Sequence, residues 1–359
     1  HLIAKKKTKW PSINKRPVFW ILLESLITVW SSISLNDELR WSLLNFFQIK
    51  KVNKMCGQSW KADWLLQNKN QKLLNNKGEF LNAEEGEKVL QIAENDAYLF
   101  AEVDDLGRYR KKQGYINKHI KEVLNLKLVD VEAIKKAKFK VVVDAVNSTG
   151  GIAIPALLEK LGVECVELYC DPNGEFPHNP EPLKEHLTDI SELVVQEKAD
   201  LGFVVDPDVD RLAIVNEDGS MFGEEYTLVA CADYVLGKTK GNTVSNLSSS
   251  RALRDITQKH GGNYMASAVG EVNVVTSMKS INAVIGGEGN GGIIYPESHY
   301  GRDSLVGVAL FLSHLAHLKI SCKELRDSYP SYFMSKNKIE LTPEINVDVL
   351  LEKMALKYK

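Results

Sequence analysis

Cysteine is scarce in this 359-residue sequence, which contains five cysteines and no Cys-x-x-Cys pair. An odd number of widely spaced cysteines indicates neither a disulfide framework nor a zinc knuckle. We therefore expect reduced thiols and a cytoplasmic protein.

An excess of charge of either sign is also absent, because 45 Lys and Arg stand against 47 Asp and Glu and the net charge is −2. The sequence has no basic stripe interleaved with aromatic residues, which is the pattern that holds a nucleic-acid backbone. We expect no nucleic-acid partner.

Long uninterrupted hydrophobic runs are missing as well. Residues 18–30, VFWILLESLITVW, follow a basic lead and have the outline of a signal or anchor segment. Glu24 interrupts the run, however, and no small-residue cleavage pattern is clear. We interpret it as a chance apolar stretch or an amphipathic helix, so a membrane is not an expected partner.

From about residue 71 onward the chain alternates between strand-like and helix-like segments. A buried strand at 140–143 leads through a polar turn into the helical segment 152–162, and a second strand follows at 163–170. The same rhythm restarts after Gly241. We predict an α/β fold of successive βαβ modules, with mixed sheets flanked by helices and a boundary near 237–241.

Three carboxylates at every second residue end the apolar run 201–206. They are Asp206, Asp208 and Asp210, and Arg211 follows directly. In extended backbone alternate side chains point to the same side, so the three carboxylates would face one way and repel one another without a cation. Oxygen ligands without a nearby histidine or thiolate favour Mg²⁺.

This acidic stretch has two other interpretations. Glu217 completes the spacing of a calcium-binding EF-hand loop, but Arg211 stands where that loop needs glycine and the flanks are strand-like. A solvated acidic turn is also possible. It would be costly beside apolar strands without a counter-ion.

Residues 286–292, GGEGNGG, place Glu288 and Asn290 among five glycines. Glycine allows a close approach of the backbone to a ligand, and the two polar side chains can hydrogen-bond a polyol. The alternative is a flexible hairpin turn. Because strand-like segments flank both sides, we favour a shaped turn.

Residues 299–303, HYGRD, precede an apolar helix. Asp303 or Ser304 is suited to cap that helix, and Arg302 is available for an anion. We interpret three further histidines as packing or surface residues rather than metal ligands: His119, His314 and His317.

Together these motifs resemble the α-D-phosphohexomutase family, which comprises phosphoglucomutases, phosphomannomutases and phosphoglucosamine mutases. VVDPDVDR (204–211) is similar to the family's metal loop and GGEGNGG (286–292) to its sugar loop. Three further segments match in order and spacing: VVVDAVNSTGG (141–151), FPHNPEP (176–182) and ASAVGEVNV (266–274).

The resemblance implies a Mg²⁺-dependent isomerase that acts as an intramolecular phosphotransferase. It would interconvert hexose 1-phosphate and hexose 6-phosphate through a phosphoserine and a hexose bisphosphate. On this chain, Asp206, Asp208 and Asp210 would hold Mg²⁺ and Arg211 would orient phosphate. The family's lysine for proton transfer would correspond to Lys72.

The same resemblance implies that three residues recognise the substrate. Glu288 and Asn290 would bind sugar hydroxyls, and Arg302 would line the same cleft.

Two family motifs have no counterpart in this sequence. The family's Thr-Ala-Ser-His-Asn-Pro motif should precede the segment 72–80, KLLNNKGEF, but the nearest serine, Ser59, lacks it. The phosphate-binding Arg-x-Ser-Gly-Thr-Glu-Pro loop is also missing. We therefore expect an incomplete member, or alternatively a non-catalytic protein that binds sugar phosphate and metal.

The resemblance implies a division of the chain into five parts. Residues 1–70 are unassigned and atypical, since they hold all six tryptophans, and a shifted reading frame would explain them. Residues 71–135 would be a remnant of domain I. Domain II with the metal loop would span 136–238, and domain III with the sugar loop would span 239–342. Residues 343–359 would begin a linker to a fourth domain.

Overall fold

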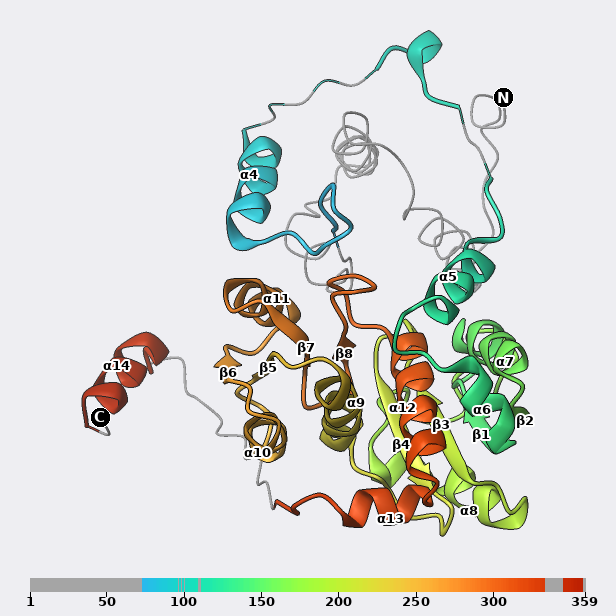
Figure 1. Ribbon diagram of the computed structural model, residues 1–359. Coiled ribbons are helices and arrows are strands. Elements are labelled where there is room, and N and C mark those ends of the chain that lie inside the picture. Colours follow the sequence, from blue (N-terminus) through green and yellow to red (C-terminus); the bar gives the residue numbers. More distant parts are fainter. Residues whose placement is uncertain are drawn as a thin grey trace.

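The computed structural model describes residues 73–95, 97, 99, 101–108, 111–332 and 345–357 (Figure 1). Four predictions lie outside these ranges: the apolar stretch 18–30, the atypical segment 1–70, Ser59 and Lys72. In the part of the chain that is described, no helix is both long and apolar enough to cross a membrane.

The first sheet has the strand order β2-β1-β3-β4. Its strands are β1 (Lys140–Asp144), β2 (Glu164–Leu168), β3 (Leu201–Val205) and β4 (Leu212–Asn216). The central strand β1 pairs in parallel with β2 and β3, whereas β3 and β4 form an antiparallel hairpin. All of β3 and β4 is buried, as expected for strands covered on both faces.

The second sheet repeats this topology with the order β6-β5-β7-β8. Its strands are β5 (Asn242–Asn246), β6 (Tyr264–Ser267), β7 (Ala283–Gly287) and β8 (Ile293–Ile294). Here too the central strand β5 has parallel neighbours and the last pair is antiparallel. The β3–β4 and β7–β8 connections therefore occupy equivalent positions, and the predicted α/β fold with mixed sheets is confirmed.

Helices connect the strands of both sheets in the same way. Within the first repeat, α7 (Gly150–Leu161) leads from β1 to β2, and α8 (Thr188–Gln196) leads to β3. The equivalent helices of the second repeat are α10 (Ala252–Lys259) and α11 (Glu271–Ser280). The described residues also form α4 (Ala83–Glu94), α5 (Tyr115–Leu124), α6 (Val131–Ala137), α9 (Glu224–Lys238), α12 (Ser304–Leu318), α13 (Cys322–Asp327) and α14 (Val347–Lys357).

Two helices, α9 and α12, pack against each other between the sheets (Figure 1). Almost every residue of α12 is buried, because this helix is apolar around its whole circumference. Phe311 of α12 meets Phe203 and Phe222 edge to face, with ring centroids 6.2 and 5.2 Å apart. One continuous core therefore joins both repeats and fixes the two sheets relative to each other.

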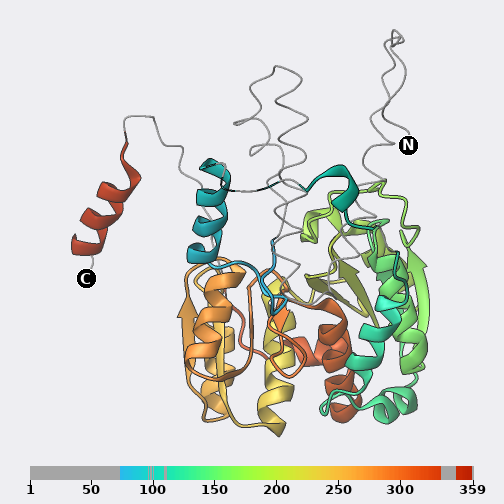
Figure 2. The same cartoon turned by 90° about the horizontal axis from the view of Figure 1, so that it is seen from above.

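The outer face of each sheet has a smaller core of its own. Helix α8 covers the first sheet with Ile190 and Val194, and α11 covers the second with Val274 and Met278. Residues 73–82 lie beside α11 in both views (Figure 1, Figure 2), where Glu79 forms an ion pair with Lys279 at 2.6 Å.

The start of α12 follows the predicted capping chemistry. Asp303 Oδ1 accepts hydrogen bonds from the backbone N–H groups of Leu305 and Val306, at 2.8 and 3.2 Å. These groups have no partner inside the helix, so a side-chain acceptor at this position defines where it begins. Asp303 is the N-cap and Ser304 the first helical residue.

Candidate functional site

The acidic loop connects β3 to β4 at the carboxyl end of β3, the edge where α/β sheets commonly bind ligands. One carboxylate oxygen from each of Asp206, Asp208 and Asp210 lies within 4.8 Å of the others. Asp206 and Asp210 are buried, whereas Asp208 is exposed. The structure thus brings together the three predicted metal ligands.

The route by which they converge differs from the predicted extended backbone. The loop is a turn in which Val209 has a φ of 58°. Asp206 Oδ1 accepts the N–H groups of Asp210 and Arg211, both at 3.0 Å, and this folds the chain back toward the first aspartate. Alternation along a strand is therefore the wrong explanation, and an Asx-type turn is the right one.

Burial raises the pKa of Asp206 to about 7, and repulsion from Asp210 and Asp208 adds to this effect. A carboxyl group in such surroundings gains from a nearby cation, which favours its ionised form. The donor set consists only of carboxylate oxygens, with an exposed side at Asp208, and so it fits a hard divalent cation such as Mg²⁺.

The glycine-rich loop connects β7 to β8, the position equivalent to the acidic loop in the first sheet. Glu288 is 6% exposed, and its two oxygens accept hydrogen bonds from Asn246 Nδ2 and Arg302 Nη1, both at 2.8 Å. Asn290 is half-buried, and its Oδ1 accepts the N–H of Gly292 at 3.3 Å. These contacts favour a shaped turn over a flexible hairpin.

The two loops touch each other directly. The N–H of Leu212, at the end of the acidic loop, donates to the carbonyl oxygen of Gly291 at 3.0 Å. Gly291 has a φ of 89°, and a Cβ at this position would lie 2.5 Å from the carbonyl oxygen of Leu212. Glycine is required here because both the backbone conformation and the close approach exclude a side chain.

Arg302 links the loops through its guanidinium group. Its Nη2 lies 2.6 Å from Asp210 Oδ2, its Nη1 lies 2.8 Å from Glu288 Oε2, and its Nε lies 3.0 Å from Glu271 Oε2. All four side chains are nearly buried. The predicted metal loop and sugar loop therefore form one ionic cluster.

Arg211 lies on the more open side of the acidic loop, with 29% of its side chain exposed. Its Nε is 3.6 Å from Asp206 Oδ2, and its Nη1 donates to Glu181 Oε1 at 3.4 Å. The latter contact brings the FPHNPEP segment to the edge of the site. Arg211 keeps N–H donors for an anion that arrives from solvent.

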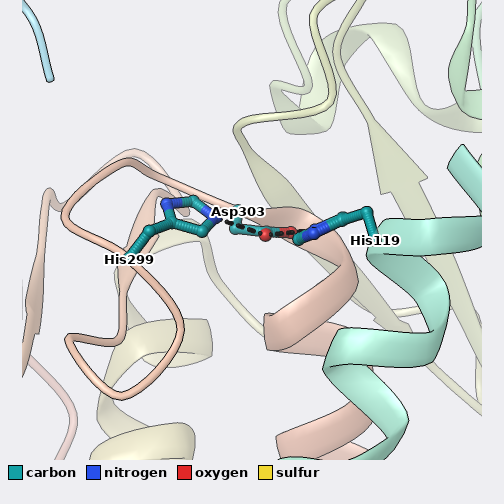
Figure 3. A group of neighbouring side chains, drawn as sticks. All are labelled: His119, His299 and Asp303. Atoms are coloured by element: carbon teal, nitrogen blue, oxygen red, sulfur yellow. Dashed lines mark hydrogen bonds and ion pairs between the residues drawn. The ribbon is translucent and has the colours of Figure 1, made fainter. Parts of the chain in front are cut away.

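His119, His299 and Asp303 form a cluster of two histidines and one aspartate (Figure 3), and Asp303 follows Arg302 in the chain. His119 Nε2 and His299 Nε2 approach Asp303 Oδ2 from opposite sides, at 2.7 and 2.9 Å. The N–H of Gly301 donates to His299 Nδ1, so the neutral ring carries its proton on Nε2 and donates it to Asp303. This arrangement is a hydrogen-bonded cluster, and His119 does more than the packing predicted for it.

His314 and His317, also interpreted above as packing or surface residues, lie at the opposite end of α12. His314 is buried and lies 3.3 Å from the Tyr329 hydroxyl, and His317 Nε2 lies 2.9 Å from Asp130 Oδ2. Both are away from the acidic loop, in agreement with their interpretation as packing or surface residues.

Sequence reasoning missed two polar residues of the cluster, Asn246 and Glu271. Asn246 ends β5, and Glu271 opens α11 just after β6. Both follow the carboxyl ends of parallel strands, and this position was the available signal. Lys72, the predicted proton-transfer residue, lies outside the described residues.

Two family models match this chain in succession. "Phosphoglucomutase/phosphomannomutase, alpha/beta/alpha domain II" matches residues 114–219, and the corresponding model for domain III matches residues 223–332. The division of the chain at residues 70, 135, 238 and 342 stays a prediction.

Relatives and solved structures agree with these matches. A phosphoglucomutase/phosphomannomutase from Thermococcus kodakarensis is 35% identical over 269 residues, which are 74% of this chain and 58% of the relative. A phosphomannomutase/phosphoglucomutase from Pseudomonas putida is 32% identical over 247 residues, which are 68% of this chain and 50% of the relative.

A crystal structure of a phosphoglucomutase/phosphomannomutase family protein from Burkholderia thailandensis superposes with a TM-score of 0.62 at 25% identity, over 71% of this chain and 54% of that one. The chain thus spans between half and three fifths of the length of these proteins. The two matched models together cover more than half of this chain, and both the acidic loop and the glycine-rich loop lie within them. The chain therefore belongs to the phosphoglucomutase/phosphomannomutase family.

Proposed function

We propose that this chain supplies the metal-binding and sugar-binding parts of a Mg²⁺-dependent phosphohexomutase. The reaction would interconvert hexose 1-phosphate and hexose 6-phosphate through a phosphoserine and a hexose bisphosphate. The observation that carries this proposal is the joining of the acidic loop and the glycine-rich loop in one ionic cluster through Arg302.

The charge of this cluster supports a divalent cation. Its five carboxylates belong to Asp206, Asp208, Asp210, Glu271 and Glu288, and its two guanidinium groups belong to Arg211 and Arg302. When all are ionised, three negative charges remain in a partly buried volume, which is unfavourable without a counter-ion. When bound there, Mg²⁺ neutralises charge on the oxygens of a transferring phosphoryl group.

Each remaining residue of the site has a role that its surroundings support. Arg211 is the cation with solvent access and would orient the phosphate. Each oxygen of Glu288 accepts one hydrogen bond and keeps acceptor capacity for a sugar hydroxyl, and half-buried Asn290 would bind a neighbouring hydroxyl. Lys72 stays a proposed proton-transfer residue on the resemblance alone.

A second candidate function is non-catalytic binding of sugar phosphate and metal. It is favoured by the sequence, which has no Thr-Ala-Ser-His-Asn-Pro motif to carry the phosphoryl group. Both candidates share the same binding site and differ only in turnover.

Calorimetry with Mg²⁺ and with glucose 1,6-bisphosphate tests the shared site, and we expect saturable binding of both by the full chain. A coupled assay with glucose 1-phosphate, mannose 1-phosphate and glucosamine 1-phosphate then separates the candidates. Turnover at an ordinary enzymatic rate supports the mutase. Binding without turnover supports the second candidate, and absence of saturable binding contradicts both.

The proposed location is the cytoplasm. Four cysteines in the described part of the chain are free thiols, as expected in a reducing compartment: Cys165, Cys170, Cys231 and Cys322.

A further inference from the structure

Arg302 offers little accessible surface to a phosphate group. Three of its five N–H donors are directed at the carboxylates of Asp210, Glu271 and Glu288, and its side chain is only 9% exposed. A phosphate oxygen that reached this guanidinium group would lie close to all three carboxylates. Repulsion between like charges in a buried setting opposes that approach.

The three carboxylates come from different parts of the fold. Asp210 belongs to the loop after β3, Glu288 to the loop after β7, and Glu271 to the first turn of α11. A planar guanidinium group offers donors in fixed directions, so it sets the relative positions of all its partners. Glu288 is also held by Asn246, which leaves it little freedom to follow another partner.

The backbone on both sides fixes Arg302 itself. Its own N–H donates to Glu271 Oε1 at 3.2 Å, and the N–H of Asp303 donates to the carbonyl oxygen of Ile293 at 2.9 Å. Asp303 in turn caps α12 and accepts hydrogen bonds from His119 and His299 (Figure 3). The guanidinium group therefore extends from a rigid point, which lies at the start of the helix between the two sheets.

Gly292 leaves room for the side chain of Arg302, because it has no Cβ. A Cβ at this position would lie 2.3 Å from Arg302 Cδ. Because Gly292 itself does not have a positive φ, the close contact with the arginine stem is the specific reason for glycine here.

We propose that Arg302 is a positioning residue that couples the metal loop to the sugar loop, and that it does not bind substrate phosphate. This inference rests on the proposed function for what the two loops bind. It assigns to one buried cation the task of keeping the Mg²⁺ ligand Asp210 and the sugar ligand Glu288 in register.

The variant Arg302→Lys tests the coupling, because lysine keeps the charge but cannot direct donors at three carboxylates. By calorimetry we expect about tenfold weaker binding of Mg²⁺ alone and about tenfold weaker binding of glucose 6-phosphate, since both loops lose their common anchor. Arg254→Lys is the matched control, because this arginine is 38% exposed and pairs with its neighbour Asp255. It should change neither affinity.

Gly292→Ala provides an independent disturbance, because it displaces the arginine stem without altering any charge. We expect the same joint loss of affinity for Mg²⁺ and for glucose 6-phosphate. Weaker sugar-phosphate binding with unchanged Mg²⁺ affinity in Arg302→Lys would show a phosphate ligand instead and would overturn the proposal, as would unchanged binding of both.

A ligand-free measurement separates this inference from the proposed function. Asp210→Asn and Glu288→Gln are combined in a double-mutant cycle of the unfolding equilibrium constant, first with Arg302 and then in the Arg302→Lys background. We expect at least fivefold non-additivity with arginine and additive effects with lysine. Additive effects with arginine present would overturn the coupling even if Mg²⁺ and sugar phosphate bind. Non-additivity without any binding would instead contradict only the proposed function.

Discussion

His119 Nε2 lies 2.7 Å from Asp303 Oδ2, across 184 positions of the sequence. This hydrogen bond ties α5 to the N-terminus of α12 (Figure 3), and Asp303 directly follows Arg302 in the chain. It raises the pKa of His119, although burial acts in the opposite direction. The charged ring is favoured by Asp303, whose own pKa is held far below its usual range by the two histidines.

The first prediction concerns the pH dependence of stability. A raised pKa in the folded state means that the contribution of His119 is full below its ordinary pKa of 6.5 and is lost as pH rises through the higher folded value. We expect the destabilisation caused by His119→Gln to shrink by on the order of 1 kcal/mol between pH 5.5 and pH 8.5. Urea unfolding of both proteins across this range measures it.

His186→Gln is the control for that experiment. His186 Nε2 is 3.5 Å from the exposed carboxylate of Glu185, and such a surface pair contributes little. An equal effect of His119→Gln at every pH would show that the His119–Asp303 bond does not depend on charge.

The second prediction separates metal binding from stability. Asp208→Asn removes an exposed oxygen ligand and should weaken Mg²⁺ binding at least tenfold, or ~1.4 kcal/mol, by calorimetry. The same change removes repulsion from Asp206, so the metal-free protein should be no less stable. Asp218→Asn, in the next turn of the chain, should leave Mg²⁺ affinity unchanged. Retention of full affinity in Asp208→Asn would count against the metal assignment.

The third prediction concerns the charge of Arg302. Arg302→Met leaves three nearly buried carboxylates without their cation and should lower the free energy of unfolding by about 3–5 kcal/mol. Arg254→Met, at a partly exposed site, should stay within about 0.5 kcal/mol of wild type. Denaturant unfolding compares the two, and a loss below about 1 kcal/mol for Arg302→Met would mean that the carboxylates find other partners.

The fourth prediction uses two helical glycines. A Cβ on Gly151 of α7 would lie 2.1 Å from the carbonyl oxygen of Cys170, which is backbone and cannot easily move. Gly151→Ala should therefore destabilise by about 2–3 kcal/mol. Gly86 of α4 has open space around it, so Gly86→Ala should cost nothing and favour the helix by roughly 0.5–1 kcal/mol. Thermal unfolding and helix content by circular dichroism measure the pair.

Most of the fold could be predicted from local patterns. The buried strands 140–143 and 201–206 and the apolar helix after Asp303 stand out because their periodicity and capping residues are local properties. The acidic loop was also evident, since three aspartates beside apolar strands are chemically unusual. Its backbone was not, because the turn at Val209 depends on hydrogen bonds to Asp206.

Local sequence is enough to show which residues carry charge and which segments become strands and helices, since propensity, spacing and side-chain chemistry act within a few residues. Long-range packing, in contrast, makes Arg302 face carboxylates rather than an anion from solvent, and one of these, Asp210, lies 92 positions earlier in the chain. The repeat of one topology in two sheets brings equivalent loops to a common edge, and the shared core of α9 and α12 holds them there. Such long-range contacts follow from how the sheets pack, which no local pattern encodes.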